Sequence, residues 1–111
     1  MTYKVSLIEE SKKDIKNLIK KYPLIKKDIL TLIDSLEIEP ISIGIHLGKN
    51  IYKIRIKNSS NKKGKSGGFR VIYYVITEYF EVLILKIYSK SYIDSMSDED
   101  ILKILEKALE E

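Results

Sequence analysis

The sequence has no cysteine and a single histidine, His46, among its 111 residues. The absence of cysteine excludes a disulfide-stapled scaffold, a thiolate metal site and a cysteine nucleophile. A lone histidine argues against a histidine-based zinc site and against a Ser-His-Asp triad. Because His46 stands in a connection that contains glycine, we expect a surface or turn residue there and not a catalytic one.

Long hydrophobic runs are also missing. No stretch of about 18 apolar residues occurs, so we expect no membrane span. The first residues do not resemble a signal peptide, and we therefore expect a cytoplasmic protein. The length fits a single domain, residues 1–111, which is large enough to bury a core without disulfides. The 44% hydrophobic and 32% charged residues predict an ordered globular chain.

Acidic residues are absent from one long part of the chain, the segment 40–77. That segment carries eight cations and hence a charge of +8, whereas the remaining 12 basic residues stand against 16 acidic ones and give −4. The net charge of +4 therefore conceals a strongly basic middle, which predicts a surface that binds polyanions. A solvated loop in a lysine-rich chain is the plainer alternative. The eight cations are Lys49, Lys53, Arg55, Lys57, Lys62, Lys63, Lys65 and Arg70.

Hydrophobic periodicity predicts a strand at residues 3–7 followed by two helices. Ser11, three residues before Asp14, is typical of a capping-box start, and Pro23 separates the two helices. The pair is interpreted as an αα-hairpin whose two apolar stripes face the core. These stripes are Ile15, Leu18, Ile19 and Tyr22, and then Ile25, Ile29, Leu32, Ile33 and Leu36.

The second half of the chain predicts three strands and a final helix. Segment 41–50 mixes isoleucine with two glycines and is interpreted as an irregular connection. Strands are expected at 51–57, 69–76 and 80–88, with a glycine-rich basic loop at 58–68. Within that loop Gly64-Lys65-Ser66 looks like the end of a phosphate-binding P-loop, but a strand follows it and not a helix, so we reject a nucleotide-triphosphate site.

Ser97 is expected to cap the final helix, whose first turn holds three acidic residues. The resulting order β-α-α-β-β-β-α, with late strands joined by short links, predicts an α+β fold. Its core is a small antiparallel sheet on which the αα-hairpin packs.

Alternation in the strand at 51–57 carries the functional argument. Tyr52, Ile54 and Ile56 point toward the core, so Lys53, Arg55 and Lys57 line the other face. Arg70 stands at the head of the buried strand 69–76 and must be paired or face a cleft. Tyr88, Lys90 and Tyr92 follow at the end of the last strand. Neighbouring strand ends would place Lys90 and Tyr92 near the basic strand, and an ordinary polar strand exit is the alternative.

Three strings stand out in this half of the chain. They are Tyr52-Lys53-Ile54-Arg55, the run from Gly64 to Tyr74, and Ile87-Tyr88-Ser89-Lys90-Ser91. Together they resemble the RelE/ParE superfamily, and most of all the HigB-like RelE toxins of bacterial type II toxin–antitoxin modules. The resemblance implies an mRNA endonuclease that acts in the ribosomal A site and is silenced by a bound antitoxin. It implies cleavage without a metal or cofactor, in which the substrate's own 2′-hydroxyl attacks the adjacent phosphate.

The resemblance also assigns the site residues. Arg70 matches a phosphate-clamping arginine, and Lys53 and Arg55 match the basic pair of the preceding strand. Because a guanidinium is a poor base, Lys53 is the better acid–base candidate. Lys90 matches a lysine after the last strand and completes the expected catalytic set. Ribosomal RNA contacts are expected from Lys57, Lys62, Lys63 and Lys65, and stacking on a base from Tyr92.

Two positions depart from the archetypal pattern. Ser91 stands where that pattern has a second arginine, and Ser97 stands near its C-terminal tyrosine. Two further functions stay open. One is a gyrase poison of the ParE type, whose relatives share the fold and against which the basic strand face argues, and the other is a degenerate toxin that only binds its antitoxin. The expected partners are a cognate antitoxin, acidic or wrapping over the positive face, together with mRNA and ribosomal RNA, and no membrane.

Overall fold

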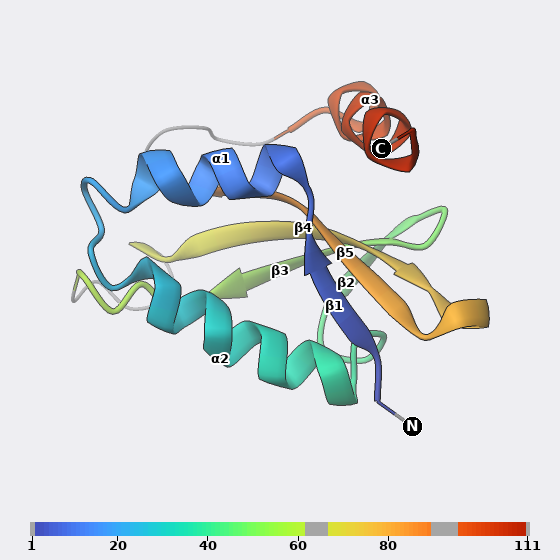
Figure 1. The fold of residues 1–111 in the computed structure, drawn as a ribbon, viewed down its shortest axis with the longest axis horizontal. Helices are drawn as coiled ribbons and strands as arrows, with labels where there is room; N and C mark the ends of the chain where they lie inside the picture. The colour runs from blue at the N-terminus through green and yellow to red at the C-terminus, as the bar shows by residue number, and fades with distance from the viewer. Residues whose placement is uncertain (1, 62–66, 90–95, 111) are drawn as a thin grey trace.

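The computed structural model describes residues 2–61, 67–89 and 96–110 and shows an α+β fold, as predicted. One sheet holds five strands in the order β1-β5-β4-β3-β2. A short 3₁₀ turn, Thr77–Tyr79, links β4 to β5. The elements in Figure 1 are β1 (Lys4–Leu7), α1 (Glu9–Leu18), α2 (Ile25–Ile38), β2 (Ile45–Gly48), β3 (Ile51–Ile56), β4 (Phe69–Ile76), β5 (Glu81–Ser89) and α3 (Asp98–Leu109).

Each face of the sheet has its own apolar core. On one face α1 and α2 cover a cluster that includes Phe69, Val71 and Tyr73 of the central strand β4, all fully buried. On the other face α3 packs through Ile101 and Leu105 against a second cluster. Figure 1 shows α3 near the start of α1 and apart from α2. The two predicted helical stripes and the buried central strand are thus confirmed.

The sheet is mixed, which corrects the expectation of a purely antiparallel one. β1 pairs parallel with β5, from Lys4 opposite Glu81 to Leu7 opposite Ile84. A parallel pair needs a long crossover connection, and the αα-hairpin with the strands after it supplies one. β2 lies at the far edge of the sheet, and β3, β4 and β5 follow it inward in chain order. The last strand, β5, therefore lies next to the first, β1.

The segment expected to be irregular contains the short edge strand β2, which forms a hairpin with β3. The turn residues Lys49 and Asn50 both have positive φ angles, 51° and 64°. Two left-handed residues in succession match the twist of the flanking strands and make a tight hairpin turn. The usual Asn-Gly signal for such a turn is absent here, so the sequence pattern gave no indication of the hairpin or of strand β2.

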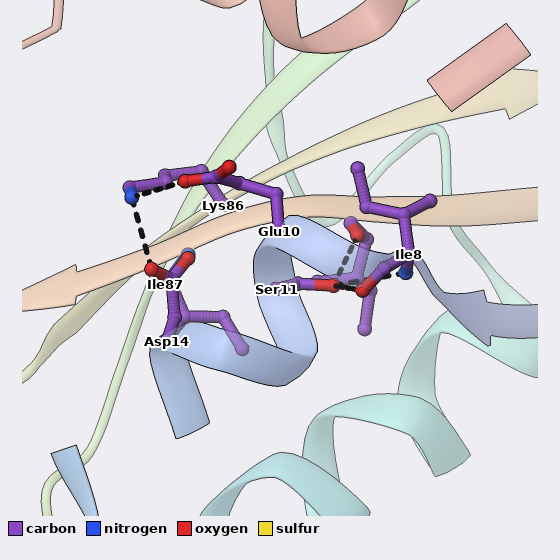
Figure 2. A network of polar contacts seen from close by, with 7 residues as sticks. Ile8, Glu10, Ser11, Asp14, Lys86 and Ile87 are labelled. Carbon is purple, nitrogen blue, oxygen red and sulfur yellow. Dashed lines mark hydrogen bonds and ion pairs between the residues drawn. The ribbon is translucent and has the colours of Figure 1, made fainter. Parts of the chain in front are cut away.

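The start of α1 also differs from the prediction. The helix begins at Glu9, and Ser11 lies inside its first turn. The Ser11 hydroxyl accepts a hydrogen bond from the Ile8 amide at 3.0 Å and donates to the Ile84 carbonyl of β5 at 2.7 Å. Figure 2 shows this polar contact beside Ile8. The buried serine therefore attaches the helix to the sheet as well as satisfying its first turn.

Gly44, just before β2, lies against the buried Tyr73, and we expect Gly44→Ala to destabilise the fold. An added β-carbon would overlap the Tyr73 hydroxyl, which donates a hydrogen bond to the Pro40 carbonyl at 2.7 Å. Because the Tyr73 ring is fully buried and stacks on Tyr52, it has no room to move. Overpacking of this kind costs about 1–3 kcal/mol, which urea denaturation would measure.

The double variant Gly44→Ala/Tyr73→Phe is the control. Tyr73→Phe alone should cost about 1 kcal/mol, because the Pro40 carbonyl loses its donor. In the double variant the overlapping oxygen is gone, so the combined loss should be smaller than the sum of the two single losses. Strictly additive losses would contradict this account.

Candidate functional site

Three predicted site residues share one face of the sheet with a fourth that was not predicted to act. Arg55 of β3 lies directly opposite Arg70 of β4, and Arg70 lies directly opposite Tyr88 of β5. Lys53 lies opposite Ile72 in the next row. Because directly opposed residues of antiparallel strands project to the same side, these side chains share the face on which α3 packs.

Arg70 is buried, with 3% of its surface exposed, and its Nη1 donates to the Gly68 carbonyl at 3.0 Å. Arg55 beside it is exposed and Lys53 is half-buried. Within residues 2–61, 67–89 and 96–110, no ion pair involves any of these three side chains. A buried charge without a counter-ion is costly, and a polyanion that enters the site would supply the missing negative charge.

Lys57 does not extend this row as alternation predicts, because β3 ends one residue earlier, at Ile56. The lysine borders a groove of about 400 Å³ between α2 and β3, together with Lys27, Ile54 and Ile56. Two cations, Lys53 and Arg55, therefore remain in the strand on the face of α3, and Lys57 borders a groove on the face of α2.

The chain leaving β3 is attached to the start of α2. The buried Asp28 carboxylate accepts a hydrogen bond from the Ser59 amide at 2.9 Å, and the Leu24 amide donates to the Ser60 hydroxyl at 2.9 Å. The first residues of the basic loop are therefore held against the start of α2. The predicted RNA-binding residues Lys62, Lys63 and Lys65 lie outside the described residues, as do Lys90, Ser91 and Tyr92.

Ser97, one of the two departures from the archetypal pattern, has a structural task. Its hydroxyl accepts a hydrogen bond from the Asp100 amide at 3.1 Å and caps α3, as predicted. A side chain that caps a helix is oriented toward the backbone of its own first turn. Ser97 therefore stabilises the first turn of α3.

Another cation near this face, Lys86 of β5, is committed to the fold. It pairs with Glu10 and Asp14 of α1, each at 2.9 Å. Figure 2 shows these two ion pairs as dashed lines. Desolvation acts to lower the pKa of Lys86, but its hydrogen bonds and the two carboxylate charges outweigh that effect and raise the pKa. Burial raises the pKa of Asp14, although the Ile87 amide and Lys86 oppose this shift. Lys86 is thus neutralised and holds α1 to β5.

His46 is exposed on β2, and its ring lies 4.9 Å from that of Tyr52. Since Tyr52 belongs to the core under α1 and α2, His46 faces away from Arg70. The part of the chain that the structure describes holds no group of three or more His, Asp or Glu side chains arranged to bind a metal ion. None of the helices in that part is long and apolar enough to cross a membrane.

Tyr88 is the residue that sequence reasoning placed near the site without giving it a role. Its ring is buried, with 2% exposed, and its hydroxyl has no hydrogen-bond partner. The tight turn pairs Ile76 with Glu81, and counting back from it would place Ile87 opposite Arg70. A register shift between Ile72 and Tyr73 moves Tyr88 into that place. A β-bulge of this kind has no reliable sequence signal, although bulges are frequent beside active sites.

Comparisons with known proteins establish the fold. No family model matches the sequence, and no curated protein matches it significantly. Among solved structures, a chain of the RelBE2 toxin–antitoxin complex from Mycobacterium tuberculosis has a TM-score of 0.61 at 19% identity, covering 80% of this chain and 99% of that one. The isolated Escherichia coli RelE toxin has a TM-score of 0.55 at 21% identity, covering 95% and 97%. A chain of the archaeal RelE–RelB complex from Pyrococcus horikoshii has a TM-score of 0.53 at 24% identity, covering 81% and 97%.

Proposed function

We propose that this RelE-like chain is the toxin of a type II toxin–antitoxin module and acts as a ribosome-dependent mRNA endonuclease. One observation carries the proposal: Arg70 is buried directly opposite Arg55, on a face where no described carboxylate pairs with Lys53, Arg55 or Arg70. Cations held in this way suit an anionic substrate whose negative charge increases during the reaction. The likeness to RelE toxins supports the same reading at the level of the fold.

The reaction would use the RNA's own 2′-hydroxyl as the nucleophile. Lys53 takes the hydroxyl proton, the oxygen attacks the adjacent phosphorus, and the bond from phosphorus to the 5′ oxygen breaks. The departing 5′ oxygen takes up a proton from water, so the products are a 2′,3′-cyclic phosphate and a 5′-hydroxyl. Arg70 and Arg55 stabilise the charge on the phosphate oxygens. Lys90 assists in this scheme, as the resemblance implies.

The proposed macromolecular partners follow from the charge of the chain. The basic residues Lys57, Lys62, Lys63 and Lys65 would contact ribosomal RNA, and Tyr92 would stack on an mRNA base. A cognate antitoxin is proposed as the protein partner, since solved complexes of RelE with RelB are among the structural matches. An acidic or wrapping antitoxin would neutralise the positive face. The ribosome places this activity in the cytoplasm.

Purified protein added to programmed ribosomes should cut the mRNA at the A-site codon, and primer extension should map the breaks. The same RNA without ribosomes should stay intact, which is the matched control. Induction in cells without antitoxin should give the same breaks together with growth arrest. Blocked replication with intact mRNA would instead support a gyrase poison. An inert chain that forms a stable complex with its antitoxin would support a degenerate toxin.

A further inference from the structure

Arg55, Arg70 and Tyr88 form a continuous row across three strands. Arg70 and Tyr88 are almost fully covered, with 3% and 2% of their surfaces exposed. Directly opposed side chains in such a row begin with their β-carbons about 4.5–5.5 Å apart. Tyr88 therefore stands next to Arg70 on the side away from Arg55.

The Tyr88 hydroxyl is one of two buried side-chain polar groups without a partner in the described part of the chain, and the other is the Asn58 amide nitrogen. Both occur at the end of the sheet where β3 and β5 finish and β4 begins. Buried tyrosine hydroxyls are ordinarily hydrogen-bonded, and an unpaired one reduces stability. A phenylalanine would fill the same space without that cost. The hydroxyl therefore does not serve the stability of the free protein, and a role in binding or catalysis would explain it.

We propose that the Tyr88 hydroxyl donates a hydrogen bond to the phosphate undergoing cleavage, beside Arg70. This inference rests on the proposed endonuclease function and adds a residue to its site. A guanidinium and a phenol both donate hydrogen bonds to anionic oxygens, so the pair can hold two oxygens of one phosphate. Because Tyr88 packs in a cluster with Ile101 and Leu105 of α3, its ring starts from a defined position. The proposal requires that RNA binding displaces the side chains that cover the hydroxyl.

Tyr88→Phe tests the proposal because it removes a single oxygen that has no partner in the protein. The unfolding midpoint should stay unchanged or rise, since no hydrogen bond is lost and a buried polar atom is removed. The rate of mRNA cleavage on programmed ribosomes should fall about tenfold or more. If the bond forms in the transition state, kcat and kcat/KM should fall together.

Tyr73→Phe is the matched control on the opposite face of the same sheet. Its hydroxyl is bonded to the Pro40 carbonyl, so this variant should lose stability and keep the cleavage rate per folded molecule. The opposite pattern in the two variants, stability lost in one and activity lost in the other, separates a substrate contact from a packing effect.

Three results would overturn the proposal. If wild type cleaves and Tyr88→Phe cleaves at the same rate, Tyr88 is a core residue and the proposed function stands without it. If Tyr88→Phe lowers the unfolding midpoint as Tyr73→Phe does, its hydroxyl is paired within the protein. If the wild-type chain leaves ribosome-bound mRNA intact, the proposed function fails and this inference fails with it.

Discussion

Replacement of Arg70 by alanine should reduce mRNA cleavage by about 10² to 10³-fold and abolish growth arrest, while the protein stays folded. That magnitude is typical for the loss of one preorganised group that stabilises negative charge in a transition state. Arg70 is held in place by burial on the central strand and by its hydrogen bond to the Gly68 carbonyl. The guanidinium is therefore already oriented before the substrate binds.

Folding should survive this change for an electrostatic reason. Removal of one member of a buried ion pair leaves an unpaired charge, but no described carboxylate pairs with Arg70. Arg70→Met is a useful companion because it fills most of the lost volume and avoids a cavity. Arg70→Lys keeps the charge but loses the planar fork that grips two phosphate oxygens, so its activity should stay well below wild type.

Cleavage assays on programmed ribosomes, paired with urea denaturation of each variant, would check this expectation. Arg55→Ala is the comparison in the same row, and its exposed side chain should contribute less than the buried Arg70. A folded Arg70→Ala protein that cuts RNA at the wild-type rate would show that the site has been placed wrongly.

The elements with strong periodicity could be predicted from the sequence. The stripe Ile25, Ile29, Leu32 and Leu36 is buried along α2, and β4 is the central strand covered on both faces. Features set by tertiary contacts could not be predicted. β2 depends on a tight turn at Lys49 and Asn50 without the usual glycine, and the parallel pairing of β1 depends on where the last strand ends.

The candidate site shows the same division. Alternation placed Lys53 and Arg55 on one face, and the hairpin between β3 and β4 brought Arg70 opposite Arg55. Lys57 falls just after the last residue of β3, and the ends of elements are the part that a sequence predicts least well. The position of Tyr88 opposite Arg70 depends on a β-bulge. A shift of one residue in the pairing moves each side chain of a strand to the other face of the sheet, so this position could not be predicted without the bulge.

Lys86→Met should lower the free energy of unfolding at pH 7 by about 3 kcal/mol, the low end of the range for breaking a buried ion pair. The lysine side chain is 17% exposed and that of Asp14 is 11% exposed, so the loss leaves a carboxylate largely out of water. Glu10 is more accessible, at 36%, and can be hydrated when its partner is gone. Asp14 therefore accounts for most of the expected loss.

The pH dependence of Lys86→Met follows from the raised pKa of Asp14. A carboxyl whose pKa is higher in the folded protein binds more protons there than in the unfolded chain. Stability therefore falls as pH rises from the ordinary value of 3.8 through the folded pKa. Loss of the lysine should raise the folded pKa further, so the deficit of Lys86→Met should shrink on acidification. In wild type, the raised pKa of Lys86 adds stability that is present below 10.5 and is lost as pH rises through its folded value.

Two further variants separate the ion pair from a general effect of losing a lysine. Lys103 also pairs with an acid, Glu99 at 3.7 Å, but both side chains are largely exposed, so Lys103→Met should change stability very little. Lys86→Met/Asp14→Asn should recover much of the loss, because an amide needs no counter-charge and its oxygen can still accept from the Ile87 amide. If the double variant were as unstable as Lys86→Met, the loss would come from the packing of the lysine stem and not from the unpaired charge of Asp14.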